Sequence, residues 1–124
     1  MQFLLLVYND AEMAGALPEG RYDTMMHDCF VHADELRAEG KLLASQQLEP
    51  ASTAKSVRIR GGKVTVTDGP FAETRELLGG FNLIEAADME EAVRIAAEFP
   101  WAQTGCIEVR PVHDIDAERR RVGA

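Results

Sequence analysis

The stretch QFLLLVY, residues 2–8, decides how this sequence folds. It lacks the alternation of apolar and polar residues that marks a strand with one wet face, and the turn formers Asn9 and Asp10 follow it. It therefore predicts a central strand. Side chains alternate along a strand, so two apolar sets are expected on opposite faces. They are Phe3, Leu5 and Val7 on one side, and Leu4, Leu6 and Tyr8 on the other.

The rest of the chain predicts a single α+β domain around this strand. Apolar residues recur at helical spacing over residues 22–39, and Gly40 is a typical C-terminal stop. Asp88 and Glu91 form a capping box that opens a second helix, which Pro100 closes. Further strands are expected at residues 41–48, 80–85 and 105–112.

A hairpin is expected between these elements. Residues 57–60 and 63–67 alternate apolar with polar on either side of Gly61-Gly62, the pattern of a two-residue primed turn. The arginines and threonines are expected to face outward. The apolar members are expected to face inward: Val57, Ile59, Val64 and Val66.

The element order is that of a ferredoxin-like split βαβ fold in which the hairpin at residues 55–68 is an insertion. Two helices can cover only one face of a four-stranded sheet. The face that carries Leu4, Leu6 and Tyr8 is then left bare, which is a liability in a monomer. We expect it to pack against a second copy, as a homodimeric α+β barrel.

Composition narrows the functional classes. The 124 residues carry 13 Lys and Arg against 21 Asp and Glu, a net charge of −8, which disfavours nucleic-acid and membrane partners. The early apolar run is too short for a signal peptide or a membrane span, so a cytoplasmic location is expected. Cys29 and Cys106 have neither disulfide-framework nor zinc spacing, and both are expected to be buried. No phosphate-binding loop, nucleophile elbow or metal motif is present, so neither cofactor nor metal is expected.

The stretch VTVTDGPFAETRELLGGF, residues 64–81, has a residue order more specific than folding alone requires. Asp68-Gly69-Pro70 predicts a sharp turn, with Phe71 anchoring the loop on the core. With the terminal Val109-Arg110-Pro111-Val112, the stretch resembles the DGPF-domain branch of the YCII-related family over residues 1–113. Residues 114–124 then form a C-terminal tail without apolar periodicity.

This resemblance implies a small bacterial protein that dimerises as an α+β barrel and is often encoded beside alternative sigma factors. In the broader family, a histidine on the first helix and an aspartate near the end of the second are proposed as an active-site dyad. Those two positions carry Cys29 and Phe99 here.

Residue chemistry leaves two functions open. The first is a cofactor-independent enzyme acting on a small organic substrate, with His32 as the proton-transfer group, because His32 borders the apolar stripe of its helix within one turn of Asp28. His27 is expected to be solvated. The second is a non-catalytic ligand-binding or regulatory dimer. The residues expected to shape a pocket in either case are Tyr8, Asp68, Phe71, Glu108 and Arg110.

Overall fold

The computed structural model describes residues 1–124 as a mixed α+β fold built on one four-stranded antiparallel sheet, ordered β2-β5-β1-β6. The central strand predicted from QFLLLVY is confirmed, because β1 pairs with β5 on one side and β6 on the other. The strands of this sheet are β1 (Gln2–Asp10), β2 (Leu42–Gln47), β5 (Glu76–Glu85) and β6 (Gly105–Pro111). The helices are α1 (Ala11–Gly15), α2 (Arg21–Ala38), α3 (Met89–Ala97) and α4 (Ile115–Val122).

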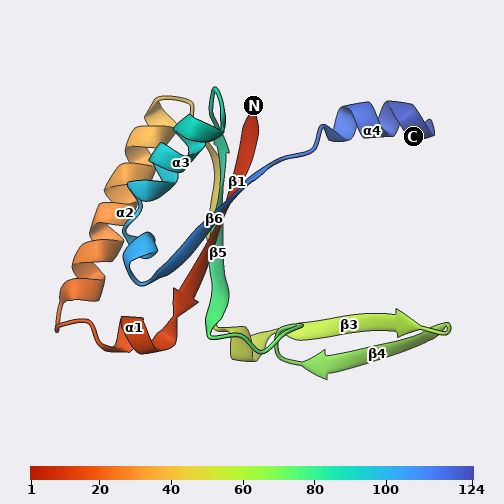
Figure 1. Ribbon diagram of the computed structural model, residues 1–124, viewed down its shortest axis with the longest axis horizontal. Helices are drawn as coiled ribbons and strands as arrows, with labels where there is room; N and C mark the ends of the chain where they lie inside the picture. The colour runs from red at the N-terminus through yellow and green to blue at the C-terminus, as the bar shows by residue number, and fades with distance from the viewer.

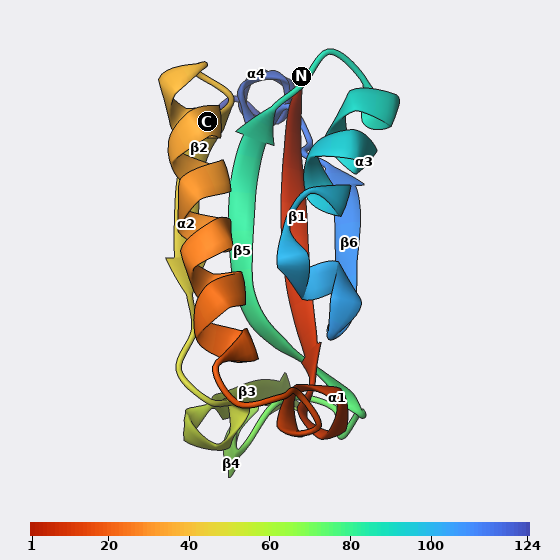
Figure 2. The ribbon, with the colours of Figure 1, turned by 90° about the vertical axis from the view of Figure 1, so that its left-hand side faces the viewer.

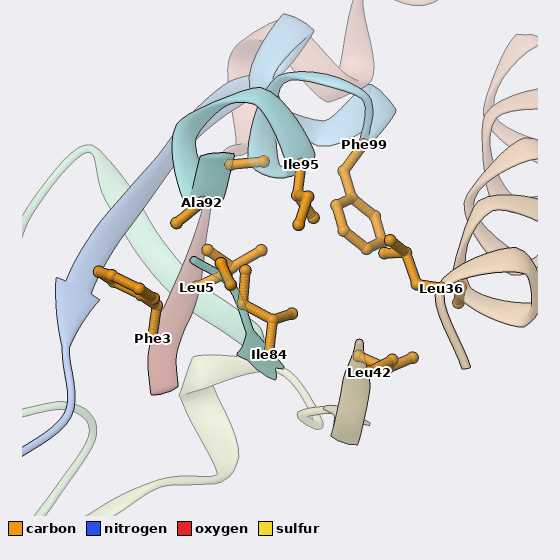
Figure 3. Close-up of a cluster of buried hydrophobic side chains, with 11 residues drawn as sticks. Phe3, Leu5, Leu36, Leu42, Ile84, Ala92, Ile95 and Phe99 are labelled. Atoms are coloured by element: carbon orange, nitrogen blue, oxygen red, sulfur yellow. The ribbon is translucent and has the colours of Figure 1, made fainter. Parts of the chain in front are cut away.

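Helices α2 and α3 lie side by side on one face of the sheet (Figures 1 and 2). Their apolar sides and the covered face of β1 form one buried cluster, in which Leu5 is 0% exposed (Figure 3). Ile107 and Val109 of β6 pack against this cluster. The order β1-α2-β2-β5-α3-β6 matches the split βαβ order expected from the sequence.

Local signals place the end of α2 and the start of α3 as predicted, whereas α3 ends at Ala97, before Pro100. Gly40 follows α2 with a φ of 74°, the left-handed conformation of a helix C-terminal stop. Asp88 caps α3 by accepting a hydrogen bond from the backbone N–H of Glu91 at 2.9 Å. The Glu91 carboxylate in turn accepts one from the N–H of Ala87 at 3.3 Å.

Two short helices stand where the sequence predicted none. The first is α1, capped by Asp10, whose carboxylate accepts bonds from the N–H groups of Glu12 and Met13. The second is α4, in the predicted tail, which begins at the cap Asp114 and ends at Gly123. Each is too short to show apolar periodicity. Each begins at a capping aspartate, and because aspartate is also common in turns, that residue alone does not predict a helix.

The predicted hairpin is a separate two-stranded sheet, β3 (Lys55–Arg60) and β4 (Lys63–Asp68), that projects away from the body; we call it the arm (Figure 1). Its four apolar side chains do share one face, since Val57 pairs with Val66 and Ile59 with Val64. The prediction that they face inward is wrong, because they are 59–63% exposed. The arm pairs with no strand of the main sheet, so its own chain supplies nothing to cover them.

The second face of the main sheet has no helix over it, and we call it the open face. Its residues follow from the strand register, in which Leu4 pairs with Leu83 and with Arg110, and Leu6 pairs with Phe81 and with Glu108. The arm and α4 both project on this side, at opposite ends of the sheet (Figure 1). The single chain is therefore shaped like a bracket around its open face.

Candidate functional site

A cavity of about 840 Å³ lies between one end of the open face and the loop that returns from the arm. The floor is formed by side chains of β1 and β6, which the sheet register places next to each other: Tyr8 pairs with Cys106. The wall is the loop that carries Pro70 and Phe71, and Leu78 of β5 completes it. Six of the twelve lining residues are hydrophobic.

The polar group on the floor is the pair formed by Tyr8 and Glu108. The Tyr8 hydroxyl donates to Oε1 of Glu108 at 3.3 Å. Burial first, and then the neighbouring Glu108 carboxylate, raise the pKa of Tyr8 above its ordinary value. The phenol therefore stays protonated at neutral pH and offers the cavity a hydroxyl rather than a phenolate. Arg110 lies on the same face and makes no ion pair within the chain.

The DGPF segment both turns the chain and lines the cavity. Gly69 has a φ of 94°, its N–H donates to the carbonyl of Ala54 at 2.8 Å, and its own carbonyl accepts from the Ser56 hydroxyl at 2.8 Å. These bonds fix the turn at the base of the arm. The prediction that Phe71 anchors the loop on the core is wrong: the ring is 84% exposed and faces no core of its own chain.

Asp68 does not line this cavity. It ends β4 with its side chain 84% exposed and forms an ion pair with Lys55, its partner across the arm. The structure thus brings together three of the predicted pocket residues, Tyr8, Phe71 and Glu108, around one cavity. Asp68 and Arg110 do not line it.

His32 lies in the helix layer, on the opposite side of the sheet. The residue is 9% exposed, Nε2 is 3.3 Å from the carbonyl oxygen of Ile95, and Nδ1 is 3.5 Å from the Glu98 carboxylate. Its ring stacks edge-on against Phe99 with centroids 4.4 Å apart. Because both nitrogens and one ring face have partners, His32 joins α2 to α3. His27, by contrast, is exposed as expected.

The two cysteines differ in environment. Cys29 is half-buried and accepts a hydrogen bond from Nε1 of Trp101 at 3.3 Å, and burial raises the pKa of its thiol above the ordinary value. The prediction that Cys106 is buried is wrong, since its place on the open face leaves it exposed beside Tyr8. Because Ile107 packs against the core cluster, strand alternation puts the side chain of Cys106 on the opposite, open face.

Sequence reasoning did not single out Trp101 or its surroundings. Trp101 packs on Tyr22 with ring centroids 5.6 Å apart, and the two rings line a smaller cavity of about 170 Å³ beneath α1. No group of three or more His, Cys, Asp or Glu side chains is placed to hold a metal ion. No helix is both long enough and apolar enough to cross a membrane.

Comparison with known proteins found a family model, a relative in sequence and a solved structure that are similar to this chain. The family model for the YCII-related domain matches residues 1–116. An uncharacterised protein of Rhizobium meliloti (strain 1021) is 36% identical over 114 residues, which cover 90% of this chain and 92% of that protein. A solved structure of 5-chloro-2-hydroxyhydroquinone dehydrochlorinase from Burkholderia phenoliruptrix AC1100, in complex with 2,5-dihydroxybenzoquinone, is 16% identical with a TM-score of 0.44, and the alignment covers 94% of this chain and 98% of that one. A likeness at this level carries no activity over to this chain.

Proposed function

We propose that this chain, which belongs to the YCII-related family, falls in the DGPF-domain branch and is a homodimeric ligand-binding protein with a regulatory or accessory role. The proposed site is the cavity between the DGPF loop and the open face. The observation that supports it is a highly exposed aromatic ring, Phe71, that lines the same cavity as a hydroxyl–carboxylate pair, Tyr8 and Glu108.

The dimer is part of this proposal. Leu4, Leu6 and Phe81 lie on a sheet face that no element of their own chain covers. Packing that face on the same face of a second copy would bury these side chains and give a ferredoxin-like dimeric α+β barrel. It would also place the cavity near the subunit interface. The role beside alternative sigma factors implied by the DGPF resemblance stays a prediction.

The chemistry of the cavity suggests the class of ligand. Its walls are mainly apolar, and its floor presents a carboxylate that accepts hydrogen bonds. A small aromatic molecule that carries a hydroxyl or amino group fits both features. A carboxylated analogue would bring a second negative charge close to Glu108, which is unfavourable in a partly desolvated site.

Saturation-transfer NMR with benzyl alcohol, benzylamine and benzoate tests the site. We expect signals from the first two probes and a weaker one from benzoate. Phe71→Ala combined with Tyr8→Phe should remove the signals, whereas Val93→Ala, an exposed site on α3, should leave them unchanged. Equal signals in the double variant and the wild type would rule this cavity out.

An enzyme that uses a histidine of α2 is the alternative. The position of His32 argues against it, because the sheet separates the imidazole from Tyr8 and Glu108, and both ring nitrogens already have partners. Turnover of a hydroxylated aromatic that is lost in His32→Ala, with the fold retained by circular dichroism, would favour this alternative instead.

A further inference from the structure

The arm is the largest feature that the proposed ligand site does not explain. It exposes four apolar side chains on one face, and its other face carries cationic ones, with Arg58 opposite Thr65 and Arg60 opposite Lys63. A hairpin with one apolar face is only marginally stable by itself in water. The pattern is typical of a surface that becomes covered in an assembly.

Charge indicates what covers it. The arm, residues 55–68, holds four basic residues and one acidic residue, so nine basic and twenty acidic residues remain in the rest of the chain. A cationic arm is therefore attracted to the strongly anionic body of another copy. Phosphate-rich partners are disfavoured, because the same anionic body repels them.

Length indicates where the arm reaches. Strands of six residues extend about 20 Å, twice the roughly 10 Å that separates two packed sheets. The arm projects from one end of the sheet toward the open-face side (Figure 1). If two open faces pack together, each arm must pass the end of the partner's sheet.

The opposite end of the sheet offers a matching surface, which we call the α4 groove. It is a hollow of about 500 Å³ at the root of α4, between the start of β1 and the end of β6. Its apolar lining residues are exposed: Met1, Val112 and Ile115. Its rim carries Asp114 and Asp116, while the arginines of α4 lie in its last turn.

The geometry points to a reciprocal exchange in which the arm of one copy lies in the α4 groove of the other. This inference rests on the proposed dimer and adds the residues that hold its two copies together. Two two-fold arrangements keep the strands of both sheets aligned: one brings arm to arm, and the other brings each arm to the partner's α4 groove. Charge selects the second, because the first places two cationic arms together and the second places apolar against apolar with Asp116 near the cationic arm tip.

Crosslinking between two tagged chains tests the exchange. In a Cys29→Ala, Cys106→Ala background, one chain carries Ile59→Cys and the other Ile115→Cys, and a short bismaleimide is added to the mixture. We expect a covalent heterodimer as the main product. The control uses Thr65→Cys, on the cationic face of the same arm, in place of Ile59→Cys. We expect its yield of covalent heterodimer to be at least about tenfold lower, because reactive groups on the wrong face rarely meet.

Sedimentation equilibrium on the same samples separates the two ways to fail. A monomer at micromolar concentration overturns the proposed dimer, and the exchange with it. A dimer without the Ile59→Cys to Ile115→Cys link, or one in which Ile59→Cys chains link to each other, overturns only the exchange.

A second pair of variants measures the apolar contact without any crosslinker. Ile59→Asp with Val64→Asp should raise the dimer dissociation constant at least about tenfold, and Thr65→Asp should change it far less. The side chains are already exposed in the single chain, so folding does not confound the result. Arm-dependent binding to phosphatidylserine vesicles, with an unchanged dimer, would overturn the proposal in favour of a lipid surface.

Discussion

The two faces of β1 are built from similar side chains and meet different surroundings. On the covered face, Phe3 and Leu5 are 1% and 0% exposed beneath α2 and α3. On the open face, Leu4 and Leu6 are only half-buried, and no helix lies over the sheet on this side (Figure 1). The run of hydrophobic residues is thus enough to predict the strand. Whether a face of that strand is covered depends on how many helices the same chain supplies.

The difference separates two kinds of stability. The covered face contributes to the folding of one chain, because its partners belong to the same chain. The open face contributes little until a second surface arrives, since half-exposed side chains gain only part of their transfer free energy. Substitutions on the covered face should therefore change the stability of the single chain, and substitutions on the open face the stability of the dimer.

Leu5→Ala should have the largest effect on folding. The side chain is fully enclosed in the core cluster, so its removal should lower the free energy of unfolding by about 3–4 kcal/mol. Urea denaturation followed by circular dichroism measures this loss. Leu4→Ala, on the open face, is the matched control and should lose less than half as much in the monomeric state. Similar losses for the two variants would mean that both faces stabilise the single chain to the same extent.

Leu6→Asp should weaken the dimer and leave the folding of the single chain nearly unchanged. A carboxylate on the open face remains hydrated in the single chain, so the fold should persist with little change in its unfolding midpoint. In a dimer the same charge would be buried opposite apolar side chains, and the dissociation constant should rise by about a hundredfold. Sedimentation equilibrium measures this change. If Leu6→Asp dimerises as tightly as the wild type, the open face is not the interface.

Most of the fold could be predicted because short-range rules determine it. The apolar run of β1, the Gly40 stop, the capping box at Asp88 and the Gly61-Gly62 turn each depend on a few neighbouring residues. What covers a side chain in the folded protein does not depend on its neighbours in the sequence in this way. Alternation shows that Ile59 and Val64 share a face, and says nothing about whether any element covers that face.

The candidate site was only partly predictable for the same reason. The place of Glu108 follows from the sequence, because alternation along β6 from the core-facing Ile107 and Val109 puts it on the open face. Phe71 was misplaced because an aromatic residue after a tight turn suggested an anchor, while the loop in fact returns from a projecting arm. His32 borders the apolar stripe on a helical wheel, and only the packing of α3 against α2 shows that it becomes buried.

His32→Ala should have an intermediate effect, confined to the covered side. Loss of the contact with Phe99 and of the bond to the Ile95 carbonyl should lower the free energy of unfolding by about 2 kcal/mol. Benzyl alcohol binding at the open face should not change. His27→Ala is the exposed control and should stay within about 0.5 kcal/mol of the wild type. Lost probe binding with unchanged stability would give His32 a role at the ligand site.

Asp10 should make the smallest of these contributions, and one that depends on pH. The backbone N–H of Met13 first, and then Arg75, whose Nε donates to the carboxylate at 2.7 Å, hold the pKa of Asp10 below its ordinary value. A carboxyl group with a lowered pKa in the folded state stabilises the fold above its unfolded pKa, and the contribution disappears as pH falls through the folded value. The urea midpoint of the wild type should therefore fall below about pH 4, and Asp10→Asn should remove part of that pH dependence.

Asp68→Asn is the matched control for Asp10, because Asp68 also pairs with a cation but lies on the arm with its side chain 84% exposed. Exposed ion pairs of this kind contribute little to folding, about 0–1 kcal/mol. The pH profile of Asp68→Asn should thus follow that of the wild type. Equal changes in the two variants would mean that the link from Arg75 to β1 stabilises the start of β5 no more than a surface pair does. The loop that carries Phe71 would then be held beside the cavity by the turn at Gly69 and by the hydrogen bond that Arg58 donates to the Phe71 carbonyl at 3.2 Å.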